Sequence, residues 1–386
     1  MEGKESNIGS SSSTPNLIAK SKPYTTQFQG FSVPSEHISS IISFQKHFQA
    51  LDDDIIIATK PKSGTTWLKA LVFSIVNRHR YTLSNTPLNF TTPHLLVPYF
   101  DLELYKENPN PDLYTIPSPR IFSAHLPYPI LADSIKHSNC RIIYMTRNPF
   151  DNIVSYWHFI NGMNNTPKPS LEDCFETFCR GEEVYGPFWD HALGYWNMSL
   201  EKPSNVLFLR YEELLEDPVA QTKRFAEFLG FPFSMEEEKT GMVNQIVDFC
   251  SFNNLKILEV NKTGKTPGPK IPSNKLFFRS GKVGDYVNYF SPAVERLSNI
   301  LKEKLSGIRL NFQAINTFNL PSYPKVNTVV YAGTLSGGER RLQCNKSDAP
   351  FRETAIVVIK QLINNYNRCR ANLSLTSTVQ EHLLST

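Results

Sequence analysis

The chain has 386 residues, of which 40% are hydrophobic and 20% are charged, and its formal net charge is +4. This length can bury one large core and a small appendage, whereas the weak positive charge argues against a protein that binds nucleic acid. No apolar run approaches the roughly 18 residues that a bilayer requires, so we expect no membrane span.

The cysteines and the N-terminal part indicate the compartment. The six cysteines are scattered and show neither C-x-x-C spacing nor the His-plus-Cys clusters of metal sites. The N-terminal part lacks the continuous apolar core of a secretory signal. We therefore expect a cytoplasmic protein with reduced thiols and no metal site.

Three regions are expected along the chain. Residues 1–22 are rich in Ser, Lys and Asn and predict a disordered arm, residues 23–313 form the patterned domain, and residues 314–386 predict a poorly ordered extension of unknown role. Apolar runs predict strands at 54–59, 120–124, 141–146 and 205–211, and helical patterns predict helices at 66–77, 131–137, 149–161, 171–179, 186–200, 218–229 and 292–305. This alternation predicts an α/β fold with a mostly parallel central sheet, helices on both faces, and ligands bound at the carboxyl ends of the strands.

The first predicted strand leads into a short turn and a helix. The turn and the helix start contain a lysine, three hydroxyls and one glycine, namely Lys62, Ser63, Gly64, Thr65 and Thr66. In such a strand–loop–helix unit, the free N–H groups of the turn and of the helix N-terminus face the same anion. The loop of an NTPase, G-x-x-x-x-G-K-[ST], places lysine after the second glycine. Here the lysine precedes the only glycine, so we expect a phosphate ligand other than the triphosphate of ATP.

The run from Pro61 to Trp67, P-K-S-G-T-T-W, resembles the 5′-phosphosulfate loop of the cytosolic sulfotransferases, most closely that of the plant members. That family transfers a sulfuryl group from 3′-phosphoadenosine 5′-phosphosulfate (PAPS) to a small molecule. The resemblance covers residues 24–312. It implies that the loop residues hold the 5′-phosphate, that Lys62 also stabilises the leaving oxygen, and that Trp67 offers a face to adenine. The alternative is an ordinary helix start in which Ser63 or Thr65 merely caps.

The second motif, F-S-A-H-L-P, ends the predicted strand 120–124 and contains His125. A histidine at the mouth of the site has a near-neutral pKa that suits it to take a proton from a hydroxyl. The catalytic histidine of the family stands in a stretch that commonly reads T-H-x-P. The resemblance therefore implies that His125 is the base, with Ala124 in place of the usual threonine. The alternative is a histidine whose hydrogen bonds are satisfied within a turn.

The third motif joins strand 141–146 to the next predicted helix and contains Arg147 and Ser155. The planar guanidinium of arginine suits a phosphate dianion. Ser155 lies two helical turns further on, where its hydroxyl can reach the same ligand. In the family these positions hold the 3′-phosphate, and the resemblance places Ser155 beside Lys62 and His125 in the catalytic set. The alternative is a surface arginine and an unrelated helix serine.

Two later segments complete the expected nucleotide site. Tyr211, at the end of the predicted strand 205–211, matches a tyrosine that helps to enclose adenosine in the family. The segment 277–286 resembles the family's R-K-G-x-x-G-D-W loop, which closes on the 3′-phosphate, and this implies contacts from Arg279, Ser280 and Gly281. Ser280 stands where the family has lysine, and Tyr286 stands where it has tryptophan. The alternative is an unrelated surface turn.

Together these motifs predict in-line transfer of a sulfuryl group to a hydroxyl of a small phenolic, flavonoid, steroid or similar plant metabolite, without a metal. We expect the walls of the acceptor pocket to come from aromatic-rich segments, namely 28–34, 91–100, Phe159 and 249–268. The dimer motif of animal relatives, K-x-x-x-T-V-x-x-x-E, is not intact near 282–291, which favours a monomer.

Two other functions stay open. A small-molecule kinase could use the loop of Lys62 for ATP, although the lysine is misplaced and no acidic metal-binding strand is evident; magnesium dependence would distinguish it. A non-catalytic nucleotide-binding relative is suggested by Ser280, Tyr286 and the extension 314–386. The segment 335–339, L-S-G-G-E, looks like the signature of ATP-binding-cassette proteins, but no G-x-x-x-x-G-K-[ST] loop accompanies it.

Overall fold

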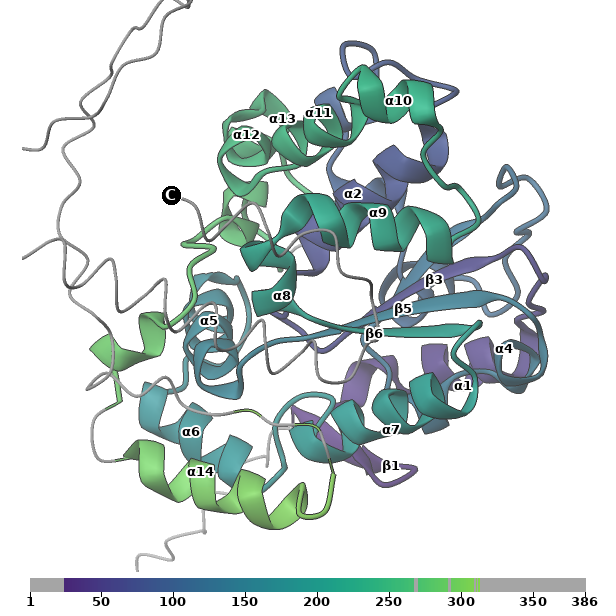
Figure 1. Ribbon diagram of the computed structural model, residues 1–386. Helices are drawn as coiled ribbons and strands as arrows, with labels where there is room; N and C mark the ends of the chain where they lie inside the picture. Colours follow the sequence, from purple (N-terminus) through teal and green to yellow (C-terminus); the bar gives the residue numbers. More distant parts are fainter. Residues whose placement is uncertain (1–23, 267–269, 291–292, 309, 311, 313–386) are drawn as a thin grey trace, which may run out of the picture. The chain divides into compact units, whose positions relative to one another are not determined.

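The computed structural model describes residues 24–266, 270–290, 293–308, 310 and 312, and it is centred on a four-stranded sheet (Figure 1). The strands have the order β4-β3-β5-β6, and every neighbouring pair is parallel. Their bounds are β3 Ile55–Thr59, β4 Ile121–Ala124, β5 Arg141–Thr146 and β6 Val206–Arg210. The predicted parallel sheet is confirmed. The fourth strand ends one residue before Tyr211, which begins a helix instead.

Helices cover both faces of this sheet. In Figure 1, α2 and α9 lie over one face, and α1, α4 and α7 lie over the other. The helices are α1 Ile38–His47, α2 Thr65–Asn77, α3 Pro93–Leu96, α4 Asp133–His137, α5 Pro149–Gly162, α6 Leu171–Cys179, α7 Phe188–Glu201, α8 Tyr211–Glu216, α9 Pro218–Phe228, α10 Met235–Lys239, α11 Met242–Phe249, α12 Phe252–Ile257, α13 Glu259–Lys262 and α14 Ala293–Lys304. Short helical turns are η1 Ser35–His37, η2 Pro87–Asn89, η3 Phe100–Leu104, η4 Tyr128–Ile130, η5 Asn274–Phe277 and η6 Asp285–Asn288.

Strand β3 shows why the sequence folds in three layers. Its side chains alternate between two hydrophobic clusters: Ile55 and Ile57 belong to one, and Ile56 and Ala58 to the other. Successive side chains of a strand point to opposite faces, so a strand covered on both faces reads as a continuous apolar run. The run I-I-I-A therefore fixes β3 at the centre of the molecule and points the following loop at one edge of the sheet.

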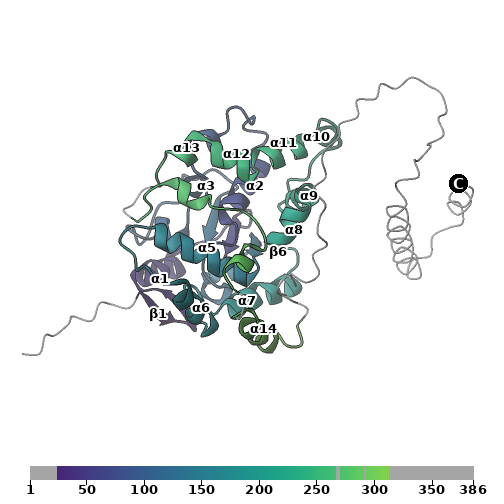
Figure 2. The same ribbon diagram turned by 90° about the vertical axis from the view of Figure 1, so that its left-hand side faces the viewer.

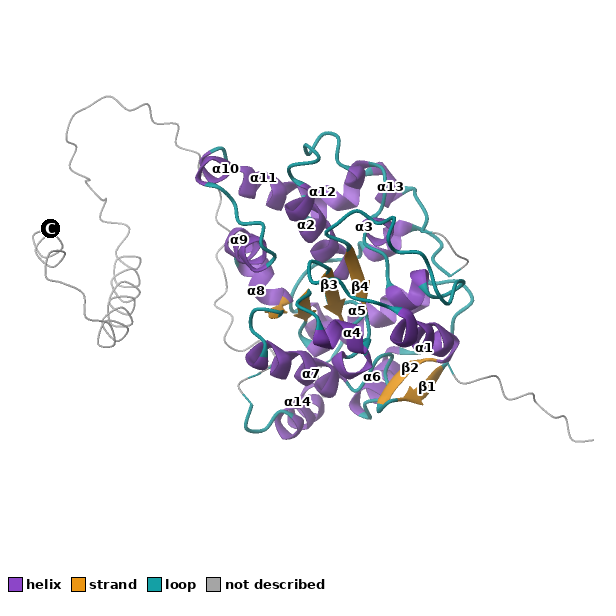
Figure 3. Cartoon of the chain, turned by 90° about the vertical axis from the view of Figure 1, so that its right-hand side faces the viewer, coloured by secondary structure: helices purple, strands orange, loops and turns teal. Residues whose placement is uncertain are grey.

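The segment 28–34, expected to line the acceptor pocket, is instead part of a small antiparallel hairpin (Figure 3). Strand β1 Thr25–Phe28 pairs with β2 Phe31–Pro34. Both turn residues, Gln29 and Gly30, have positive φ, of 50° and 86°, as a two-residue hairpin with right-handed twist requires. Because the side chains of β2 are buried in the core, this segment is a packing element rather than a cavity wall.

The second half of the expected acceptor region is more regular than the sequence indicates. Within 249–268 the structure forms α12 and α13, which follow α11 in an arc of short helices (Figure 2). The side chain of Ser251 caps α12 by accepting a hydrogen bond from the Asn254 N–H at 3.3 Å. Helices this short contain too few turns to produce a readable apolar period.

The two terminal regions expected from the sequence, 1–22 and 314–386, lie outside the described residues, as does the start of the last predicted helix at residue 292. Within the described part of the chain, every helix is too short or too polar to cross a bilayer.

Candidate active site

A cavity of about 840 Å³ lies where the four parallel strands end. Each strand contributes the residue expected of it: Lys62 follows β3, His125 follows β4, Arg147 follows β5 and Tyr211 follows β6. The cavity is lined by every predicted site residue except Ser63: Lys62, Gly64, Thr65, Thr66, Trp67, His125, Arg147, Ser155, Tyr211, Arg279, Ser280 and Gly281. Segments that are separated by more than two hundred residues in the sequence thus meet at one edge of the sheet.

The loop before α2 adopts a conformation that requires its glycine. Lys62 and Gly64 have φ of 69° and 96°, in the left-handed region. A Cβ atom on Gly64 would lie 2.7 Å from Cδ2 of Tyr211, so a larger residue would displace the tyrosine. Gly64 is the N-cap of α2, and no side chain of the described residues caps it. The first N–H groups of α2 therefore remain available to an anion, and Ser63 and Thr65 are not mere caps.

Ser63 is the predicted contact that does not line the cavity. Its hydroxyl is fully buried and accepts a hydrogen bond at 3.1 Å from Nδ2 of Asn152, and its N–H donates to the Lys60 carbonyl at 3.2 Å. The same amide of Asn152 donates to the Pro61 carbonyl at 2.8 Å. Asn152, on α5, thus holds the loop between β3 and α2 in place from the side opposite the cavity. The sequence offered no signal for it, because it lies about ninety residues further along the chain.

His125 is held in one tautomer. Its Nδ1 lies 2.7 Å from the carbonyl oxygen of Thr59. A carbonyl can only accept, so Nδ1 carries the proton and Nε2 keeps a lone pair, which no hydrogen bond among the described residues occupies. Burial lowers the pKa of His125 to about 3, with the positive charges of Lys69, Lys60 and Lys62 adding to the effect. The imidazole is therefore neutral at pH 7 and its Nε2 lone pair carries no proton, but burial makes it a weaker base than the near-neutral histidine expected from the sequence.

Lys62 is a cation without a carboxylate partner among the described residues. Its ammonium lies 3.9 Å from the centre of the Phe159 ring, a cation–π contact. Burial, followed by the charges of Arg147 and Arg279, lowers the pKa of Lys62 to about 7. An anion in the cavity would oppose these effects, because a nearby negative charge favours the ammonium form of Lys62.

Two arginines approach the cavity from other elements. Nη2 of Arg147 donates to the Lys282 carbonyl at 2.7 Å, and Arg279 forms an ion pair with Asp285 at 2.7 Å. In each arginine the Nε–H is buried and has no hydrogen-bond partner within the described part of the chain. Buried donors are rarely left unpaired in proteins, so these two groups fit an additional acceptor such as a phosphate.

Aromatic rings enclose the same end of the cavity. Trp67 packs edge to face with Tyr211, with their centres 5.6 Å apart, and the buried indole N–H of Trp67 has no hydrogen-bond partner among the residues that the structure describes. The Tyr211 hydroxyl donates to the Gly281 carbonyl at 2.7 Å. Gly281 has φ of 68°, and a Cβ on it would lie 2.8 Å from Phe252. Tyr211 thus joins α8 to the loop that carries Arg279.

Asp151 holds that loop, a role that no local pattern in the sequence indicates. Its carboxylate accepts from the N–H groups of Gly284 and Tyr286, at 2.8 and 3.1 Å. The Tyr286 ring packs 5.0 Å from that of Phe150 in the core. The tyrosine at the position where the family has tryptophan is therefore a packing residue, and it does not line the cavity.

The segment 91–100 contributes a polar cluster rather than a simple apolar wall. Nε2 of His94 lies 2.9 Å from the hydroxyl of Thr66, and Lys69 packs 3.4 Å from the centre of the Tyr99 ring. Burial holds the pKa of His94 well below its usual value. His94 and Tyr99 line the cavity, as do Phe159 and the helix α12. Residues 28–34 do not line it, because they form the hairpin.

Comparisons with known proteins show which family the chain resembles. A family model described as "Sulfotransferase domain" matches residues 52–309. Cytosolic sulfotransferase 14 of Arabidopsis thaliana is 46% identical over 310 residues, covering 78% of this chain and 89% of the relative. Flavonol 4′-sulfotransferase of Flaveria chlorifolia is 41% identical over 289 residues, covering 74% and 89%. The crystal structure of mouse sulfotransferase SULT7A1 complexed with PAP superposes with a TM-score of 0.58 at 27% identity, covering 74% and 95%.

Proposed function

The chain belongs to the sulfotransferase family, and on that premise we propose that it transfers the sulfuryl group of PAPS to a hydroxyl of a small acceptor. As a sulfotransferase it is an enzyme of class EC 2.8.2. The observation that carries the proposal is the meeting of an uncapped helix N-terminus, Lys62, two arginines and the free Nε2 of His125 in one cavity. These groups match the charges of a nucleotide with phosphates at two positions.

The nucleotide fits this cavity by the chemistry of its lining. Lys62, Gly64, Thr65 and Thr66 hold the 5′-phosphosulfate, with Ser63 as their support from behind. Arg147, Ser155, Arg279, Ser280 and Gly281 hold the 3′-phosphate, and Trp67 and Tyr211 enclose the adenosine. The unpaired Nε–H groups of Arg147 and Arg279 support this placement. The adenosine 3′,5′-bisphosphate (PAP) bound to the mouse relative is the nucleotide that remains after transfer.

The transfer itself is an in-line displacement at sulfur. Nε2 of His125 accepts the proton of the acceptor hydroxyl while its oxygen forms the new bond to sulfur. The bond between sulfur and the 5′-phosphate oxygen breaks, and its electron pair stays on that oxygen, where the ammonium of Lys62 stabilises the charge. The Thr59 carbonyl keeps Nδ1 protonated throughout. Because the site holds the nucleotide and the acceptor in fixed positions, it lowers the entropic part of the activation barrier.

The acceptor is a hydroxylated, largely apolar molecule of the phenolic, flavonoid, steroid or similar plant class. Phe159 and Phe277, with ring centres 5.8 Å apart, and the ring of Tyr99 offer flat walls beside His125. The Flaveria relative is named for transfer to a flavonol, which supports a flat phenolic substrate. The relatives named cytosolic sulfotransferases support a cytoplasmic location, and the absent dimer motif supports a monomer.

An assay with two donors distinguishes a sulfotransferase from a kinase. It measures transfer from PAPS and transfer from magnesium-ATP, each with and without EDTA. Lysine and oriented amides supply the positive charge, so labelled sulfate should reach phenolic acceptors at the same rate in EDTA. Magnesium-dependent phosphate transfer from ATP, without sulfate transfer from PAPS, would contradict the proposal.

Binding of PAP is expected to take up a proton on Lys62. The pKa of this lysine in the free protein is about 7, and a bound phosphate favours the ammonium and raises it. The contribution of Lys62 to PAP affinity is therefore constant below pH 7. It falls as the pH rises from 7 toward the pKa that Lys62 has in the complex. Calorimetry between about pH 7 and about pH 9 in buffers of different ionisation enthalpy measures this uptake. Lys62→Met should abolish it, whereas uptake that persists in Lys62→Met would assign the proton elsewhere.

Ser280→Lys is expected to tighten PAP binding. Ser280 lines the cavity at the position where the family has lysine, and a hydrogen bond to a charged group contributes about 1.5–3 kcal/mol, or about tenfold or more in affinity. Ser280→Met has a long side chain without the charge and serves as the matched control. Equal PAP affinities of the two variants, measured by calorimetry, would argue against a 3′-phosphate beside residue 280.

A further inference from the structure

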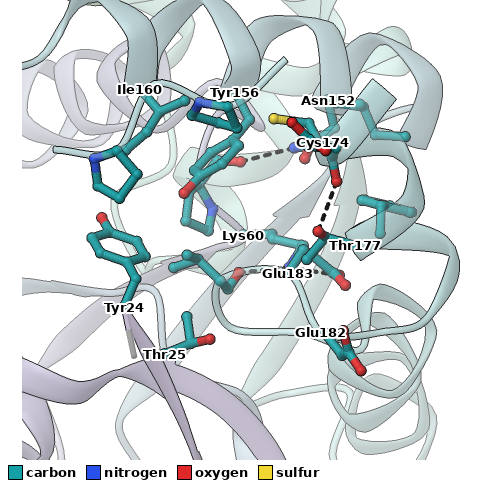
Figure 4. Close-up of a pocket in the computed structure, with 17 residues that line it drawn as sticks. Tyr24, Thr25, Lys60, Asn152, Tyr156, Ile160, Cys174, Thr177, Glu182 and Glu183 are labelled. Carbon is teal, nitrogen blue, oxygen red and sulfur yellow. Dashed lines mark hydrogen bonds and ion pairs between the residues drawn. The ribbon is translucent and has the colours of Figure 1, made fainter. Parts of the chain in front are cut away.

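A second cavity, of about 220 Å³, lies on the other side of the phosphate loop (Figure 4). Helix α5 stands between the two cavities: Ser155, His158 and Phe159 line the first, whereas Ile153 and Tyr156 line the second. The remaining walls come from β1, α6 and the segment before α7. Among the described residues, only Pro61, in the phosphate loop, lines both cavities.

The second cavity combines apolar walls with one buried ion pair. Lys60, directly after β3, is 2% exposed, and its ammonium lies 3.0 Å from a carboxylate oxygen of Glu183. It also donates to the Val184 carbonyl at 2.9 Å. Figure 4 shows Tyr24 and Tyr156 at the border of the same hollow. A cavity of about 150 Å³ already admits benzene, so this one has room for a substituted ring.

Charge limits what this cavity can accept. The charges of Lys60 and Glu183 cancel, and the exposed residues at its edge, Asp173 and Glu182, are acidic. An anion would meet these carboxylates, and a cation would compete with Lys60 for Glu183. A neutral molecule with a hydroxyl avoids both costs, because a hydroxyl can donate to a carboxylate and accept from an ammonium.

We propose that this cavity is an effector site for neutral, hydroxylated, largely apolar molecules, distinct from the site of transfer, and that its occupancy acts on the phosphate loop. The side chain of Asn152 connects this cavity to the phosphate loop. Asn152 lines the cavity, and its amide holds both the Pro61 carbonyl and the Ser63 hydroxyl. A ligand that packs against Asn152 and Pro61 restricts the loop to its nucleotide-binding conformation, so it tightens nucleotide binding.

The test uses 4-bromophenol as the probe on the full chain, with PAP saturating in the crystals and titrated in solution. In crystals, the anomalous signal of bromine should lie between Tyr156 and Glu183. In solution, saturating probe should lower the Kd for PAP by about fivefold or more. Thr177→Trp fills the cavity from α6 and should remove the bromine signal there together with the effect on Kd. Glu172→Trp places the same side chain on the exposed face of α6 and should leave both unchanged.

Cys174→Met, a smaller substitution on the same wall, replaces Thr177→Trp if that variant does not fold. The sulfate ester of 4-bromophenol, an anion, should produce neither effect. The proposal is wrong if bromine is absent from this cavity or if the probe does not change the Kd for PAP. It is also wrong if the probe lowers the Kd as much in Thr177→Trp or Cys174→Met as in the wild type. Because every measurement is of binding, the result does not depend on whether the protein transfers sulfate.

Discussion

Replacing His125 with alanine is expected to lower kcat by about 10²–10⁴-fold, the usual contribution of a positioned general base. The expectation rests on the free Nε2 lone pair at the cavity and on the Thr59 carbonyl, which fixes the tautomer. The affinity for PAP should change little, because the imidazole is assigned to the acceptor hydroxyl and not to the nucleotide. Steady-state transfer rates and calorimetry with PAP measure the two quantities separately.

His125→Asn is the matched variant. Its side-chain amide can still donate to the Thr59 carbonyl, so it preserves the local hydrogen bond while removing the basic nitrogen. We expect it to lose as much turnover as the alanine variant. Near-full activity in either variant would show that another group takes the proton. Activity in asparagine but not in alanine would show that the histidine only supports the fold.

Replacing Lys62 with methionine is expected to lower kcat by about 10²–10³-fold, the scale for removing one group that stabilises developing charge. The ammonium has no carboxylate partner among the described residues, and it packs on Phe159, which methionine can replace. The loss should therefore appear in the chemical step more than in folding. Single-turnover rates measured on the PAPS complex test this directly.

Lys46→Met serves as the control for this second prediction. Lys46 is exposed at the end of α1, in the layer of helices away from the cavity. It should retain the wild-type rate. If Lys62→Met lowered the affinity for PAPS but left the single-turnover rate unchanged, the lysine would be a binding residue, and charge on the leaving oxygen would be stabilised by other groups.

The sheet could be predicted because its strands are covered on both faces. A strand such as β3 is apolar over most of its length, and that run is visible without any knowledge of its partners. The short helices from α10 to α13 could not be predicted, because four to eight residues do not show a period. The hairpin of β1 and β2 was mistaken for a cavity wall because aromatic residues in a loop-like segment suit either role.

The residues of the site also fall into two groups, those that the sequence indicates and those that only the folded chain reveals. Lys62, His125 and Arg147 each lie beside a strand end within a local motif, so the sequence could predict that they meet at this cavity. Asn152 and Asp151 act on loops about ninety and more than one hundred and thirty residues away. Such contacts exist only once the chain is folded, and nothing in the neighbouring sequence indicates them. The cavity that contains Lys60 and Glu183 could not be predicted for the same reason, because these two residues are 123 positions apart in the sequence.

Transfer of radiolabelled sulfate from PAPS to a panel of phenols, flavonoids and steroids, in the presence of a chelator, tests the central claim most directly. PAP binding to the same preparation, followed by calorimetry, shows that the nucleotide site is intact. We predict a labelled sulfate ester of at least one acceptor and an equal amount of released PAP, with both lost in His125→Asn. Tight PAP binding without transfer to any acceptor would contradict the account and identify a nucleotide-binding relative without catalytic activity.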